Sequence, residues 1–128
     1  MANIIQTVLI RTDLFGDCTG LIAAQVAHIH AQVLMLDKAP KHTGELDFNS
    51  WKMSPYLFVK KVPNLEVLNY FMDKADKSNV QCELWKDTVY VKASQTLQIV
   101  VENCPVGISL GPCESDRIKA VIGDLPLL

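Results

Sequence analysis

A row of polar side chains runs along one predicted helix of the chain. Gln25, His28 and Gln32 fall within an arc of about 60° when residues 19–37 are drawn as a helix. Amide and imidazole groups can hydrogen-bond to an ester or to the water that attacks it, so Gln25 and His28 are candidate catalytic residues. A core histidine bonded to a backbone carbonyl is the alternative interpretation of His28. These polar side chains either line a cleft or find their hydrogen-bond partners inside the protein.

Asp87 is the third candidate catalytic residue. It follows the alternating apolar and polar segment 80–85, at the end of a predicted strand. A carboxylate in that position can orient a water molecule or accept its proton as a general base. The alternative is an aspartate that only forms the turn at the end of a strand. Both interpretations remain open from the residues alone.

The segment before the helix carries candidate substrate-binding groups. Arg11 and Asp13 follow the first predicted strand, and Thr19 and Gly20 begin the helix. The free N–H groups at a helix N-terminus attract a phosphate, a carboxylate or an oxyanion. For Arg11 and Asp13, an internal ion pair that fixes the loop is the alternative to direct substrate contact. His30 faces away from the polar row, so we expect it to be structural or at an interface.

Cys18 is an alternative nucleophile, because the helix dipole can activate a thiol that stands just before a helix start. Its base would be His28, which lies about two and a half turns further along the helix, so the geometry is poor. A small residue in a glycine-containing turn is the simpler interpretation. The four cysteines contain no CxxC pair, so we expect reduced thiols and no metal site.

The composition is that of an ordinary globular protein. The chain has 128 residues, of which 49% are hydrophobic and 20% charged, so we expect one domain over residues 1–128. No apolar run approaches the ~20 residues of a membrane span and no cleavable leader is visible, so we expect a cytoplasmic protein without a membrane partner. The net charge of −2 weighs against strong nucleic-acid binding.

The order of predicted elements indicates how these residues are positioned. Periodicity and turn residues predict an α/β fold with three α/β/α layers, in which helices lie on both faces of a mixed, mostly four-stranded sheet. A hairpin is expected around 88–101, a short helix is weakly indicated near 45–53, and Pro112 is expected in the first turn of the last helix. The strands are expected near 3–10, 56–62, 80–86 and 104–110, and the helices near 19–37, 64–78 and 113–122.

Four motifs in a fixed order resemble the type 2 peptidyl-tRNA hydrolase superfamily. They are R-T-D-L at 11–14, I-A-A-Q at 22–25 with His28, the aspartate of L-W-K-D at 84–87, and the G-P-containing segment from 111 to 127. The resemblance implies a mixed four-stranded sheet between helices and hydrolysis of the ester that joins a peptide to tRNA. It also implies a tRNA partner, a homodimer, and neither a metal nor an organic cofactor.

Two positions depart from the family pattern. The family has a lysine directly before the I-A-A-Q motif, where this chain has Leu21, and no basic residue occurs between Arg11 and Lys38. The family pattern Asp-x-Gly-x-Thr is also absent after Asp87. We therefore expect weak hydrolysis of peptidyl-tRNA or a related aminoacyl ester. A non-catalytic binding module and a small-molecule hydrolase on the same fold are the alternatives.

Overall fold

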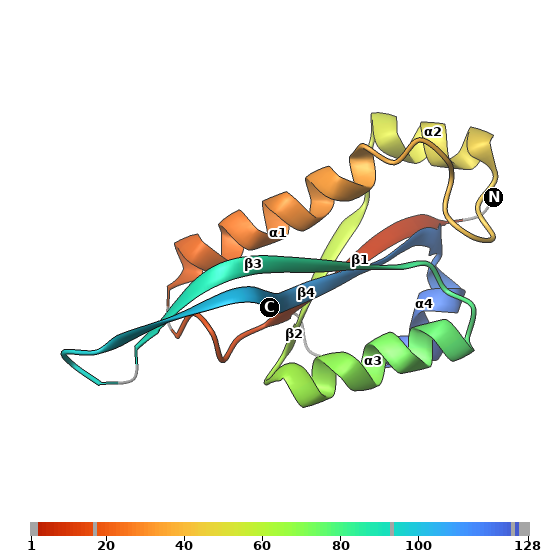
Figure 1. The fold of residues 1–128 in the computed structure, drawn as a ribbon. Coiled ribbons are helices and arrows are strands. Elements are labelled where there is room, and N and C mark those ends of the chain that lie inside the picture. Colours follow the sequence, from red (N-terminus) through yellow and green to blue (C-terminus); the bar gives the residue numbers. More distant parts are fainter. Residues whose placement is uncertain (1–2, 17, 93, 124, 126–128) are drawn as a thin grey trace.

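The structure is a computed structural model that describes residues 3–16, 18–92, 94–123 and 125. Within these residues, four helices surround a four-stranded sheet (Figure 1). The α/β class predicted from the sequence is confirmed. The elements are, in order, β1 (Ile4–Arg11), α1 (Thr19–Leu34), α2 (Glu45–Met53), β2 (Leu57–Val62), α3 (Leu65–Lys77), β3 (Cys82–Lys92), β4 (Gln98–Glu114) and α4 (Ser115–Ile122).

The sheet is mixed, and its strand order is β2-β1-β4-β3. β1 pairs in parallel with β2 and antiparallel with β4, and β3 pairs antiparallel with β4. β1 is therefore a central strand, and all but the first of its residues are buried. A strand that is covered on both faces reads as a nearly continuous apolar run, which explains the β-branched sequence at 3–10.

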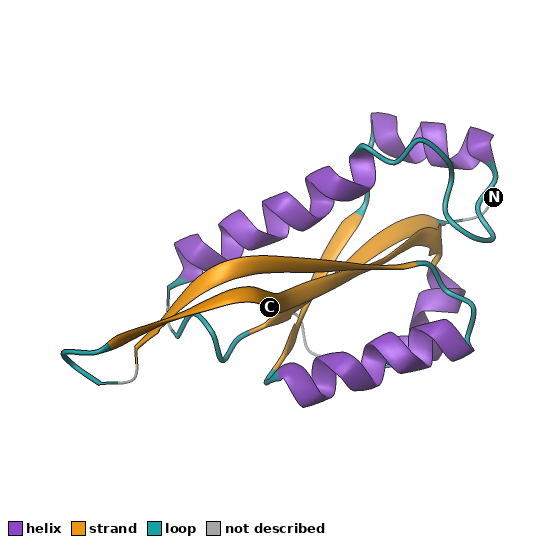
Figure 2. Cartoon of the chain, in the orientation of Figure 1, coloured by secondary structure: helices purple, strands orange, loops and turns teal. Residues whose placement is uncertain are grey.

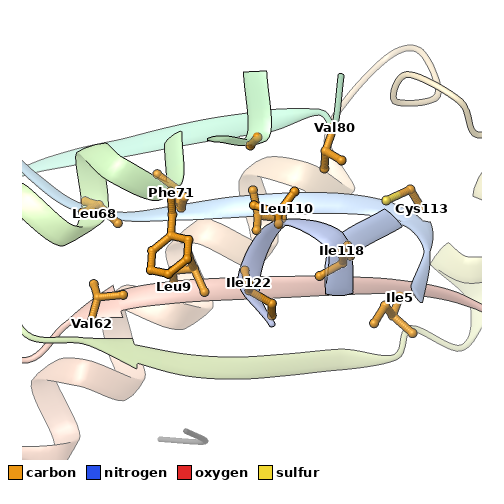
Figure 3. Packing of buried hydrophobic residues seen from close by; sticks show 13 residues of the cluster. Ile5, Leu9, Val62, Leu68, Phe71, Val80, Leu110, Cys113, Ile118 and Ile122 are labelled. Carbon is orange, nitrogen blue, oxygen red and sulfur yellow. The ribbon is translucent and has the colours of Figure 1, made fainter. Parts of the chain in front are cut away.

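Helices cover both faces of the sheet, as the element order predicted. α1 and α2 lie on one face, and α3 and α4 lie on the other (Figure 2). Successive residues of β1 point to opposite faces. Leu9 accordingly belongs to one hydrophobic cluster with Leu68 of α3 and Ile118 of α4 (Figure 3), whereas Val8 belongs to a second cluster with Ile29 of α1.

The hairpin expected around 88–101 is formed by the distal halves of β3 and β4, which extend beyond the start of α1 (Figure 1). The register between the two strands shifts twice, between Trp85 and Lys86 and between Asp87 and Val89. β4 supplies the extra residue each time, and Asn103 at the second shift has a φ of 51°. Bulges bend a strand and redirect its side chains, and these two flank Asp87. The predicted end of this strand at 86 was therefore wrong: β3 continues to Lys92, so Asp87 lies within the strand and does not form a turn at its end.

The predicted start of the last helix was wrong. Pro112 and Cys113 belong to β4, and α4 begins at Ser115. Cys113 pairs with Ile5 of β1, and the Pro112 carbonyl accepts a hydrogen bond from Thr43 Oγ1 at 2.7 Å. Pairing with a central strand keeps this segment extended, so the helix cannot begin until the pairing ends. α1 also ends earlier than predicted, at Leu34, where the chain tightens into a turn.

His30 has a structural role, in agreement with its predicted position away from the polar row. Its Nδ1 lies 2.6 Å from Gln6 Oε1, and Gln6 Nε2 donates to Ser109 Oγ at 2.8 Å. Because the Gln6 amide nitrogen is used as a donor to Ser109, its oxygen accepts from a protonated Nδ1. Burial lowers the pKa of His30, so its ring is neutral at neutral pH.

In the part of the chain that the structure describes, no helix is both long enough and apolar enough to cross a membrane. The same residues contain no group of histidine, cysteine and carboxylate side chains able to hold a metal ion. All four cysteines are free thiols.

Candidate functional site

The junction between α1 and β3 brings two of the predicted site residues together. Gln25 Nε2 on α1 donates to Asp87 Oδ2 on β3 at 2.9 Å. Gln25 is 9% exposed, whereas Asp87 keeps an intermediate exposure at the edge of the sheet. One member of the polar row, Gln25, is thus hydrogen-bonded inside the protein. It positions the carboxylate of Asp87, which solvent can reach.

Trp85 fixes the orientation of the Gln25 amide. Its Nε1 donates to Gln25 Oε1 at 2.7 Å. An indole N–H can only donate and an ionised carboxylate can only accept, so the Gln25 oxygen must face Trp85 and the nitrogen must face Asp87. Trp85 and Asp87 stand two positions apart on β3 and therefore point to the same face of the sheet. The indole thereby helps to position Asp87 through Gln25.

Asp87 is held in its ionised form. The hydrogen bond from Gln25 lowers the pKa of Asp87, the backbone N–H of Thr88 lowers it further, and the charge of His28 has a smaller effect in the same direction. Thr88 N donates to Oδ1 at 2.8 Å. Each carboxylate oxygen has two lone pairs, so both oxygens can still accept a hydrogen bond from water. The group is a weak base that is available across the neutral pH range.

His28 is exposed and stacks on Trp85. The ring centroids lie 5.4 Å apart, with an interplanar angle of 17°. The interpretation of His28 as a core histidine is therefore wrong. Because His28 is exposed and Trp85 is linked through Gln25 to Asp87, the imidazole lies on the same side of the site as the carboxylate. Gln32, the third member of the row, has a buried Oε1 without a hydrogen-bond partner among the described residues.

Arg11 and Asp13 form the ion pair that the sequence suggested as one alternative. Arg11 Nη2 lies 2.8 Å from Asp13 Oδ2, and Arg11 Nε donates to Oδ1 at 3.0 Å. Arg11 Nη1 also donates to the Pro105 carbonyl of β4 at 3.0 Å. The hydrogen bond to Asp13 raises the pKa of Arg11. The pair ties the end of β1 to β4 and fixes the start of the loop.

Thr19, Gly20 and Cys18 all stand exposed at the start of α1. Thr19 and Gly20 are the first two residues of the helix, where backbone N–H groups have no partner within the helix. Cys18 is the N-cap residue, and its side chain makes no capping hydrogen bond. His28 stacks on Trp85, and no hydrogen bond joins it to Cys18 within the described part of the chain. The predicted pairing of a thiol with this base receives no support from the contacts.

A cleft of about 380 Å³ lies beside the N-terminal turns of α1. One wall is the loop 13–16, and another comes from the distal part of β3 and β4. Leu21, at the position of the family lysine, stands in the cleft and is 51% exposed. The described lining residues are Asp13, Leu14, Phe15, Gly16, Leu21, Tyr90, Val91 and Gln98.

Sequence reasoning missed Trp85 and this cleft. The sequence did contain a signal for Trp85. Trp85 stands two positions before Asp87 on the same strand, so both side chains point to one face of the sheet, on which Val89 and Val91 are apolar. No comparable signal existed for the cleft. Its walls come from the loop and helix start at 13–21 and from the hairpin residues at 90–98, which are far from them in the sequence.

A comparison with protein families gives one match for this chain. The family model described as "Peptidyl-tRNA hydrolase PTH2" matches residues 4–128, which is nearly the whole sequence. No curated protein matches the chain at a significant level.

Proposed function

The chain belongs to the peptidyl-tRNA hydrolase PTH2 family, and on this premise we propose that it hydrolyses the ester bond of peptidyl-tRNA or a related aminoacyl ester. The observation that carries the proposal is the arrangement in which Trp85 orients Gln25 and Gln25 holds the ionised Asp87. It acts in the cytoplasm, where charged tRNA is found, as one domain over residues 1–128. No metal or organic cofactor takes part.

A water molecule is the nucleophile in this proposal. Asp87 accepts a proton from the water as its oxygen attacks the ester carbonyl carbon. Gln25 keeps the carboxylate ionised and in place, and His28, one turn further along α1, hydrogen-bonds to the ester or to the water. When the bond to the ribose oxygen breaks, the proton on Asp87 returns to that leaving oxygen. The products are the free peptide acid and tRNA with its terminal hydroxyl restored.

The start of α1 supplies the remaining groups. The free N–H groups of Thr19 and Gly20 face the charge that develops on the carbonyl oxygen, with the positive end of the helix dipole behind them. Arg11 and Asp13 hold the loop that leads to this turn. Leu21 gives no positive charge to the phosphate side of the substrate. Turnover is therefore slow, and tRNA is held weakly by a chain of net charge −2.

The pH dependence of hydrolysis tests both the activity and the role of Asp87. The rate at which N-acetylphenylalanine is released from its tRNA should exceed the rate in a buffer blank at each pH. After subtraction of the blank, the rate should stay level through the neutral range. Because Gln25 lowers the pKa of Asp87, the rate should fall only below the ordinary aspartate range. Gln25→Leu removes that hydrogen bond, so the acid limb should move to higher pH.

Gln32→Leu is the matched control for this experiment, because it makes the same change two turns along α1 without touching Asp87. Its acid limb should coincide with that of the parent. Release no faster than the blank at every pH would contradict the proposed function. An acid limb that Gln25→Leu leaves in place would instead contradict the role given to Gln25.

The protein is also proposed to form a homodimer. Several small or apolar side chains of α1 are exposed, among them Ala23, Ala27 and Ala31, and Met35 directly after the helix is exposed as well. A helix that is apolar on its solvent side as well is normally covered by another element. Sedimentation at micromolar concentration should give a species of about twice 14.2 kDa. Ala27→Glu, which places a charge in the middle of this face, should shift the protein toward monomer, whereas a parent that sediments only as monomer would contradict the dimer.

A further inference from the structure

The cleft beside α1 lies close to the proposed reacting groups. Leu21 stands one helical turn before Gln25, a rise of about 6 Å along the axis, and Gln25 is bonded to Asp87. Val91 follows Asp87 by four residues on β3, or about 13 Å of strand. An ester held at Asp87 therefore has the Leu21 edge of the cleft within reach of a group attached to its carbonyl carbon, and Val91 lies at the far end of the cleft.

The described lining of the cleft is mostly apolar. Five of its eight residues have apolar or aromatic side chains, and these include Phe15, Leu21 and Tyr90. Leu21 and Tyr90 are 51% and 65% exposed. The carboxylate in the described lining, that of Asp13, is already paired with Arg11. Large apolar side chains that stand open to solvent in a concave surface are typical of a site that takes an apolar ligand.

The volume of the cleft limits what can occupy it. At about 380 Å³ it is near the lower end of the range of roughly 300–1,000 Å³ for small-ligand pockets. It has room for one large amino-acid side chain with its blocked amine, but not for a stretch of nucleic acid. The apolar lining suits a side chain and offers little to a phosphate.

We propose that this cleft is the subsite for the side chain of the ester-linked amino acid, and that it makes the protein prefer esters of large apolar residues. The inference rests on the proposed hydrolase function. An apolar side chain leaves water when it enters the cleft, whereas a charged or polar one loses hydrogen bonds that a mostly apolar lining replaces only in part. Leu21 and Tyr90 are then specificity-determining residues.

The test compares N-acetyl-phenylalanine and N-acetyl-aspartate esterified to the same tRNA body. The parent should cleave the phenylalanine ester at least about tenfold faster, as a hydrophobic pocket typically allows. Leu21→Ser should bring the ratio toward one. Leu46→Ser makes the same change at an exposed leucine on α2, outside the cleft, and should leave the ratio unchanged. Equal rates for the two esters, or a ratio that Leu21→Ser does not alter, would overturn the subsite.

A binding measurement separates the subsite from the hydrolase function. N-acetyl-phenylalanine amide has no ester, so it reports on the cleft even if the protein cleaves nothing. Added at millimolar concentration to ¹⁵N-labelled protein, it should shift the amide resonances of residues 14–16, 21 and 91, and N-acetyl-aspartate amide should not. Resonance shifts in a protein that cleaves no ester would support binding of the side chain in the cleft and would overturn the proposed function. Absence of shifts up to 10 mM, roughly the weakest useful affinity for so small a ligand, would overturn the subsite.

Discussion

Asp87→Asn should lower the rate of ester release from peptidyl-tRNA by roughly 10²–10⁴-fold, the usual contribution of a general base. The amide has nearly the shape of the carboxylate but cannot accept the proton of the attacking water. The measurement is single-turnover release at saturating protein. If Asp87→Asn kept the full parental rate, Asp87 would have no part in activating water.

The stability of the Asp87→Asn protein must be checked in the same experiment. Gln25 and the backbone N–H of Thr88 both donate to Asp87, and an asparagine has one oxygen with which to accept. One of these two donors must therefore hydrogen-bond to water instead, which lowers the free energy of unfolding by about 1 kcal/mol. Glu83→Gln is the matched control, because it makes the same change earlier on β3 at a carboxylate bonded to Gln81. It should retain the parental rate.

Leu21→Lys should raise the rate with peptidyl-tRNA by about 10²–10³-fold, which is the typical effect of one well-placed electrostatic contact in catalysis. Leu21 is half exposed at the mouth of the cleft, so a lysine fits there without burying its charge. Its aliphatic stem can follow the apolar lining while its ammonium group reaches the substrate phosphate. The gain should shrink as salt is raised, because the new contact is between exposed charges.

Leu46→Lys is the matched control for the gain in rate. It places the same residue in the first turn of another helix, α2, where the side chain is also exposed. Both variants put a positive charge near a helix N-terminus, which costs roughly 0.3–1 kcal/mol of stability. A rate that rises equally in both would indicate a general effect of net charge on tRNA binding. No activity in the parent and none in Leu21→Lys would favour the binding-module alternative.

Local sequence signals predicted most of the fold. Asn64 was expected near the start of a helix, and its Oδ1 accepts from Val67 N at 2.9 Å as a helix cap. Period-two and period-3.6 patterns located the strands and the longer helices, because burial of one face dominates those segments. Pro112 misled the prediction, since proline is frequent at a helix start but also fits the strand pairing that β1 imposes here.

The candidate site was only partly predictable, because its parts meet across the fold. Gln25 and Asp87 were chosen by residue type and family motif, but their hydrogen bond joins positions 62 residues apart. Trp85 acts through a similar long-range contact with Gln25. Such contacts depend on how α1 crosses β3, which no local pattern encodes. The position of Leu21 in a cleft likewise depends on the bulged path of the β3–β4 hairpin.

The most direct test of the central claim is release of peptide from peptidyl-tRNA with the protein in large excess over substrate, so that even slow cleavage is seen as one exponential phase. N-acetylphenylalanyl-tRNA is incubated at neutral pH with parent protein, with Asp87→Asn protein and with buffer alone. We expect the parent to release N-acetylphenylalanine clearly faster than buffer and the Asp87→Asn protein to follow the buffer curve. Identical curves for all three samples would contradict the hydrolase function, and equal cleavage by parent and Asp87→Asn would contradict the mechanism.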